Sequence, residues 1–66
     1  MRLSVNGRPH DLPDGTALTG LLATAAPDPR GIAVAVNGSV VRAVEWPSTP
    51  LHEGDLVEVV TAHQGG

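Results

Sequence analysis

The side chains of this chain offer few groups that could catalyse a reaction. Cysteine is absent from its 66 residues, which excludes thiolate nucleophiles, thiolate metal sites and disulfide bonds. The three histidines, His10, His52 and His63, are too far apart to form a local ligand motif, and no pair has the spacing of a helical metal site. We therefore expect no metal centre.

Carboxylates and glycines also lack the spacing that enzyme sites need. Asp11 and Asp14 flank expected turns, while Glu53 and Asp55 lie in the turn before the last expected strand, so no acid/base pair is indicated. The glycines are distributed one per turn, and none leads from a strand into a helix as in a phosphate-binding loop. The sequence therefore predicts a protein that is not an enzyme and binds no cofactor.

The remaining reactive group is the terminal carboxylate, which is borne on Gly66. Neither Gly65 nor Gly66 has a Cβ atom, so the end of "VEVVTAHQGG" is thin enough to enter a channel in which larger residues would clash. A carboxylate at such an end is unhindered and easy to activate. Two terminal glycines also occur by chance, and frayed termini are common, so the signal depends on the fold that precedes it.

Charge and hydropathy limit the classes of partner. Seven acids oppose four arginines and no lysine, for a net charge of −3, which gives no basic footprint for nucleic acid or an anionic membrane. No apolar run approaches the roughly 20 residues of a membrane-spanning helix, and no charged-then-apolar leader begins the chain. We expect a cytoplasmic protein whose partners are neither nucleic acid nor membrane.

Turn signals divide the chain into short elements. The pairs Asn6-Gly7 and Asn37-Gly38 each separate two short apolar runs, which predicts two β-hairpins. Pro9 has no N–H to donate to a strand ladder, so the second strand of the first hairpin is expected at a sheet edge.

Between the hairpins, "PDGTALTGLLATAA" predicts a short amphipathic helix. Leu18, Leu21 and Leu22 fall on one helical face, and Thr16 is the expected N-cap. Gly20 lies inside the helix at a cost of about 1 kcal/mol relative to alanine, so the helix must depend on tertiary packing.

The last strand, "LVEVV", completes the order β-β-α-β-β-β. This order predicts an α+β fold of the β-grasp (ubiquitin-like) type, with one main helix on one face of a mixed sheet. In this architecture the first and last strands lie parallel at the centre of the sheet. We assign residues 1–61 to the β-grasp domain and residues 62–66 to a flexible C-terminal tail.

Alternation along the last strand separates its two faces. If Glu58 faces water, Val57 and Val59 point into the core, while Leu56 and Val60 lie on the face opposite the helix. Those two side chains could simply complete a half-buried strand, or they could form a patch on which a partner docks. In the second interpretation, Leu56 and Val60 bind the partner together with the tail.

Taken together, these segments resemble the ThiS branch of the ThiS/MoaD family of ubiquitin-like sulfur carriers. The resemblance covers essentially the whole sequence and rests on "VNG", "DGTALTGLL", "IAVAVNGSVVRAVEW", "LHEGDLVEVV" and the final "QGG". The most specific parts are the second hairpin with Trp46 downstream, the "EGD" turn and the terminal glycines. His63 departs from the small or aliphatic residue that is common in the family tail.

The resemblance implies a carrier cycle for thiamin (thiazole) biosynthesis. An E1-like, ThiF-type enzyme would use ATP to adenylate the Gly66 carboxylate, and a persulfide donor would convert it to a thiocarboxylate. The thiocarboxylate would pass its sulfur to a ThiG-type thiazole synthase. Gly65 belongs to the tail that enters these enzymes, and Leu56, Val60, His63 and Gln64 are the expected partner contacts. The free carrier is expected to be a monomer.

Two other interpretations remain at this stage. The small subunit of molybdopterin synthase, or a sulfur carrier of another pathway, shares the fold and the tail, although the short chain favours the thiamin branch. A β-grasp module that binds proteins without being conjugated or thiocarboxylated would instead act through Leu56, Val60 or a sheet edge.

Overall fold

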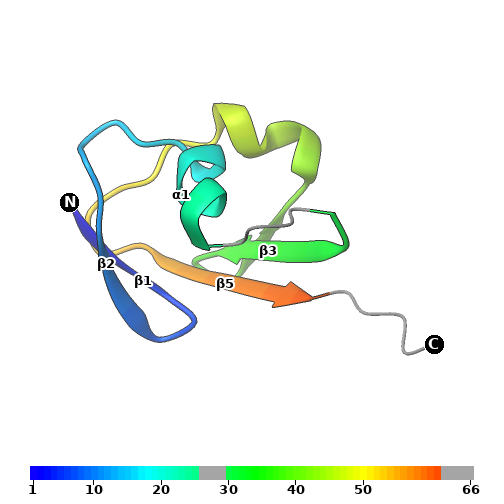
Figure 1. Ribbon diagram of the computed structural model, residues 1–66, viewed down its shortest axis with the longest axis horizontal. Coiled ribbons are helices and arrows are strands. Elements are labelled where there is room, and N and C mark those ends of the chain that lie inside the picture. Colours follow the sequence, from blue (N-terminus) through cyan, green and yellow to red (C-terminus); the bar gives the residue numbers. More distant parts are fainter. Residues whose placement is uncertain (26–29, 62–66) are drawn as a thin grey trace.

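Among the described residues, five strands and one α-helix form in the order that the sequence predicts. A computed structural model describes residues 1–25 and 30–61, and Figure 1 shows how its elements are arranged. The elements are β1 (Arg2–Val5), β2 (Arg8–Asp11), α1 (Leu18–Ala25), β3 (Ile32–Val36), β4 (Ser39–Val41), the 3₁₀-helix η1 (Ala43–Ser48) and β5 (Leu56–Thr61).

The strands form one mixed sheet in the order β2-β1-β5-β3-β4. β5 lies in the middle, parallel to β1 and antiparallel to β3, and the two hairpins form the outer pairs. Helix α1 covers one face of this sheet (Figure 1). The arrangement is that of a β-grasp, which confirms the predicted fold class. β2 is an edge strand, as Pro9 requires, and Pro9 lies opposite Ser4 of β1.

Both hairpins turn through left-handed residues. Asn6 and Gly7 have φ values of 53° and 83°, and Asn37 and Gly38 have values of 51° and 85°. A two-residue turn with both φ angles positive matches the right-handed twist of the flanking strands, and asparagine tolerates this region better than most residues. Each "VNG" segment therefore closes a hairpin, which confirms the two predicted hairpins.

The core consists of aliphatic side chains between the sheet and α1, with one tryptophan. Leu18 and Leu21 are fully buried and Leu22 is 3% exposed, which confirms the predicted apolar face of the helix. Among the residues that the structure describes, the buried apolar ones are Leu3, Val5, Leu18, Leu21, Leu22, Val34, Trp46, Leu51 and Val57. Because these residues come from strands at both ends of the chain, the core depends on long-range pairing.

The start of the helix differs from the prediction. Helix α1 begins at Leu18, and the carbonyl of Ala17 accepts the first helical hydrogen bonds, from the N–H groups of Gly20 (2.9 Å) and Leu21 (3.3 Å). Thr16 is not the N-cap, because its Oγ1 donates to the carbonyl of Pro13 (2.7 Å). The N–H of Leu18 donates instead to the carbonyl of Thr49 (2.9 Å), so tertiary contact satisfies the helix terminus.

The segment between β4 and β5 closes the helix side of the fold. It contains the 3₁₀-helix η1, which packs against α1. Trp46 of η1 is buried, and its Nε1 donates to the carbonyl of Val41 (2.9 Å). The indole therefore fills the core while its polar nitrogen stays hydrogen-bonded, as a buried tryptophan requires. The described residues include no helix long and apolar enough to span a membrane.

The glycine inside α1 gives a test of the helix packing. An alanine Cβ at position 20 would lie 3.0 Å from Cγ2 of Thr16, so the contact opposes the gain of about 1 kcal/mol in helix propensity. We expect Gly20→Ala to stabilise the fold by about 1 kcal/mol only in a Thr16→Ser background, which removes Cγ2 and keeps the hydroxyl. Urea denaturation of the four proteins of this cycle measures the coupling, and equal gains in both backgrounds would contradict the steric argument.

Candidate functional site

The expected reactive end of the chain lies beyond the part that the structure describes. His63, Gln64, Gly65 and Gly66 are outside the described residues, as is the whole of the predicted tail. The structure does describe the strand from which residues 62–66 continue. β5 ends at Thr61, which is paired with Ile32 at the start of β3.

Asn6 holds the last part of β5. β1 pairs with β5 only as far as Val5 and Val57, where the chain turns away into the hairpin. The side chain of Asn6 continues the ladder, since its Nδ2 donates to the carbonyl of Val59 (3.1 Å) and its Oδ1 accepts from the N–H of Val59 (2.8 Å). Its own N–H donates to the carbonyl of Val57 (2.9 Å). An amide side chain thus replaces a strand partner two residues before β5 ends.

Asn37 plays the corresponding part at the other end of β5. Its N–H donates to the carbonyl of Leu56 (2.7 Å), and its Oδ1 accepts from the N–H of Leu56 (2.9 Å). Its Nδ2 donates to Oδ1 of Asp55 (3.0 Å), whose Oδ2 accepts from the N–H of His52 (2.8 Å). The two predicted turns therefore also hold the two ends of the central strand.

The burial of Asp55 is a feature that sequence reasoning missed. The sequence places Asp55 in a turn before the last strand, where an exposed carboxylate is expected, yet the residue is only 8% exposed. Its two oxygens accept hydrogen bonds from different segments, which offsets the cost of removing the carboxylate from water. No local signal marks this role, because Asn37 is 18 residues away.

The face of the sheet opposite α1, here called the open face, carries exposed aliphatic side chains. Leu56 and Val60 of β5 are each 60% exposed, and Val40 of β4 is 76% exposed. Val57 is buried and Val59 is half-buried on the helix side, so the predicted division of β5 into two faces is confirmed. Whether a partner binds Leu56 and Val60 is not tested by this arrangement and stays a prediction.

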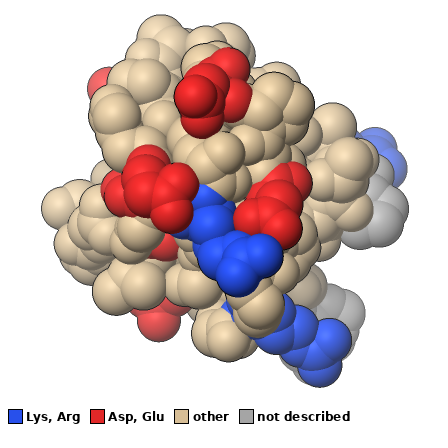
Figure 2. All heavy atoms as spheres, turned by 90° about the vertical axis from the view of Figure 1, so that its left-hand side faces the viewer, with Lys and Arg blue, Asp and Glu red and all other residues tan. Residues whose placement is uncertain are grey.

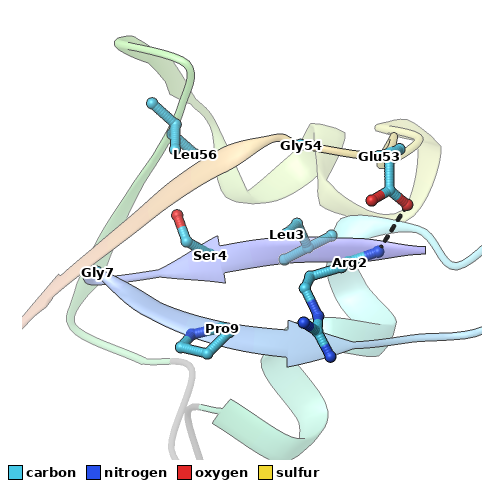
Figure 3. A pocket seen from close by; sticks show the side chains of 8 residues that line it. All are labelled: Arg2, Leu3, Ser4, Gly7, Pro9, Glu53, Gly54 and Leu56. Carbon is cyan, nitrogen blue, oxygen red and sulfur yellow. Dashed lines mark hydrogen bonds between the residues drawn. The ribbon is translucent and has the colours of Figure 1, made fainter.

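A shallow groove of about 400 Å³ crosses the open face next to Leu56 (Figure 3). Ser4 lies in register with Pro9 on one side and with Leu56 on the other, so a small side chain is flanked by two larger ones. The groove is lined by Arg2, Leu3, Ser4, Gly7, Pro9, Glu53, Gly54 and Leu56. Leu3, Pro9 and Leu56 give part of this lining an apolar character.

Charged residues gather at the end of the sheet away from the end of β5. Arg2, at the start of β1, donates from Nε and Nη2 to the two carboxylate oxygens of Asp11 (2.9 and 3.0 Å), and its backbone N–H donates to Oε1 of Glu53 (2.8 Å). Figure 2 shows acidic side chains around an arginine on this side of the molecule. The hydrogen bond from Arg2 lowers the pKa of Asp11 below its usual value, and the same contact raises the pKa of Arg2.

The described histidines are not brought together. Within residues 1–25 and 30–61, no group of three or more His, Asp and Glu side chains could hold a metal ion. His10 lies in β2, where its Nδ1 is 3.2 Å from the carbonyl of Arg8. His52 lies in the turn before β5, with its Nδ1 3.9 Å from Oδ2 of Asp55.

Comparison with known proteins gives the same assignment from sequence and from structure. The ThiS family model matches residues 3–66. The curated sulfur carrier protein ThiS of Thermus thermophilus is 39% identical over 62 residues, which cover 94% of this chain and 95% of that protein. A thiazole synthase of Magnetococcus marinus is 38% identical over 66 residues, which are all of this chain and 20% of that protein.

Two solved structures of a thiamine biosynthesis protein from Geobacter metallireducens share the fold. The crystal structure of that ThiS has a TM-score of 0.86 and 30% identity, with full coverage of both chains. The solution structure has a TM-score of 0.78 at 30% identity and covers all of this chain and 88% of that one. A match over the complete length supports the fold and the family together.

The ion pair at the charged end predicts a pH effect. Because the folded pKa of Asp11 is lowered, the unfolded chain binds more protons, and the pair stabilises the fold above the usual carboxyl pKa. This contribution is lost as the pH falls through the lowered pKa of Asp11. We expect Arg2→Gln to return the Asp11 pKa towards its usual value in a carboxyl NMR titration. Arg8→Gln, a control with the same charge change, should leave Asp11 unaltered, and an equal shift would contradict the pairing.

The two asparagines predict local effects at opposite ends of β5. Glycine keeps the left-handed turn but removes the amide side chain, so Asn6→Gly and Asn37→Gly should each lower stability by about 1–3 kcal/mol. Hydrogen exchange separates the two variants: the Val59 amide should lose protection in Asn6→Gly and the Leu56 amide in Asn37→Gly. Unchanged protection of Val59 in Asn6→Gly would show that the side chain does not hold the strand.

Proposed function

The chain belongs to the ThiS family, and on this premise we propose that it is a sulfur carrier protein of thiamin biosynthesis and not an enzyme. The observation that carries the proposal is the family match through residue 66, which includes the two terminal glycines along with the whole domain. The relatives described above, a sulfur carrier and a thiazole synthase, favour the thiazole pathway over the molybdopterin alternative.

We propose that the carried sulfur is bound to the carboxyl carbon of Gly66. A free carboxylate is a poor acyl electrophile, so it needs a better leaving group before sulfur can add. An E1-like, ThiF-type enzyme supplies one by transferring AMP from ATP to the carboxylate with release of pyrophosphate. The terminal sulfur of a persulfide then attacks the acyl carbon and displaces AMP, and cleavage of the S–S bond by a thiol leaves the thiocarboxylate.

The composition of the chain suits this cycle. With no cysteine in the sequence, sulfur cannot be carried on a side-chain thiol of this protein. With no lysine, no side-chain amine of the chain can capture the activated acyl group. These two absences support the C-terminal carboxylate as the group that carries the sulfur.

Partner contacts follow from the position of β5. Leu56 and Val60 lie exposed on the strand that continues into residues 62–66, so an enzyme that takes the tail passes close to the open face. We propose that these two side chains, with His63 and Gln64 of the tail, contact the adenylating enzyme and the thiazole synthase. We further propose that residues 1–61 act as the docking domain of a cytoplasmic carrier that is monomeric when free, and that residues 62–66 act as the transferred tail.

Deletion of Gly66 tests the proposal. The complete chain, incubated with a ThiF-type enzyme, ATP and a persulfide donor, should gain the mass of one oxygen-to-sulfur exchange, located in its C-terminal peptide. The variant lacking Gly66 should gain none, while its circular dichroism and urea midpoint stay unchanged because the buried core is built from earlier residues. Glu45→Gln, an exposed substitution on η1 that leaves the whole tail intact, is the control and should still be converted. Sulfur transfer by the variant that lacks Gly66 would refute the carrier mechanism.

A further inference from the structure

A single carboxylate lies in the middle of the open face. Glu58 is exposed on β5 between Leu56 and Val60, and it is in register with Ala35 of β3, which is itself in register with Val40 of β4. Alternation puts all five of these side chains on the same face of the sheet. The acid is therefore bordered by aliphatic side chains along its own strand and across two others.

Within the described residues, the carboxylate of Glu58 makes no salt bridge and no hydrogen bond. By contrast, the carboxylate of Asp11 pairs with Arg2, and that of Glu53 accepts the N–H of Arg2. Glu58 therefore keeps its full capacity to accept hydrogen bonds from a partner.

Any protein that covers the aliphatic side chains must also remove Glu58 from water. Leu56 and Val60 lie two residues to either side, so burying them surrounds the carboxylate with apolar atoms. A carboxylate buried without a partner is strongly unfavourable, whereas one that meets arginine or lysine gains charge-assisted hydrogen bonds. The open face thus suits a surface that presents a basic side chain among apolar ones.

The same charge argues against a second copy of this chain. In a two-fold dimer formed through the open face, the same patch faces itself, and a residue at its centre lies close to its own symmetry mate. Two Glu58 carboxylates would then be buried near each other, and like charges in that position are destabilising. A net charge of −3 on each copy adds to the repulsion.

We propose that Glu58 is a specificity determinant and that the occupant of the open face is thiazole synthase, docked with an arginine or lysine on Glu58. An apolar side chain of the synthase would fill the groove over Ser4, next to Leu56. This inference rests on the proposed function. The choice of thiazole synthase is supported by the M. marinus protein of that name, in which a segment similar to this whole chain occupies 20% of the length.

Binding of the purified thiazole synthase from the same organism tests the assignment. Glu58→Gln keeps the shape of the side chain and removes its charge, and we expect it to weaken binding by about tenfold, with Glu58→Arg weaker still. Glu45→Gln makes the same charge change on η1, on the helix side of the sheet, and should bind within about twofold of the unaltered chain. The unaltered chain should also lose more affinity with added salt than Glu58→Gln does.

Equal affinities of Glu58→Gln and Glu45→Gln would overturn the role of Glu58. The intact mass of the same samples reports whether the Gly66 thiocarboxylate forms. This second measurement tests the carrier mechanism independently of binding to the synthase. If the thiocarboxylate forms but the unaltered chain does not bind the synthase, the choice of partner is wrong and the carrier mechanism stands. If the thiocarboxylate never forms under conditions in which the adenylating enzyme consumes ATP, the proposed function itself is wrong.

Discussion

Hydrogen bonding along both edges of β5 organises the fold. This strand is central, so it must be matched on both edges, by β1 in parallel and by β3 in the antiparallel direction. β1 is too short to reach the end of β5, and the amide of Asn6 continues the pairing to Val59. β5, near the end of the chain, pairs with β1, near its start. The register of this pairing decides which side chains of β5 face α1, so it also decides that Val57 is buried in the core.

The two faces of β5 differ in exposure because one α-helix covers only one face of the sheet. The described part of the 66-residue chain contains no second α-helix for the other face. Val57 is buried on the covered side, while Leu56 and Val60 remain exposed on the other. A small domain can accept such exposed side chains when a partner covers them for part of a functional cycle. Glu58 between them keeps the uncovered face charged, which disfavours self-association and favours a basic partner.

A carrier needs a stable domain and an accessible reactive end, and it does not need catalytic side chains. The composition is consistent with this division: buried aliphatic residues and Trp46 form the core, while Asp11 forms a surface ion pair and Asp55 holds a turn. Asp55 is an example, since its buried carboxylate ties Asn37 and His52 to the turn that starts β5. In the proposed cycle the chemistry is left to the partner enzymes, and this protein contributes shape, charge and a terminal carboxylate.

The order of the elements and the candidate chemistry follow from local patterns in the sequence. Alternation in "LVEVV", helical spacing of the leucines and the Asn-Gly turns are local patterns, so the β-grasp order and the faces of β5 could be predicted, and the terminal glycines pointed to Gly66. Only the tertiary structure showed that Asn6 bonds Val59, 53 residues away, that Asn37 bonds Asp55, and that Thr49 and not Thr16 satisfies the start of α1. Local patterns report how each segment exposes its own side chains, whereas hydrogen bonds between distant segments depend on strand order and packing, which no single segment encodes.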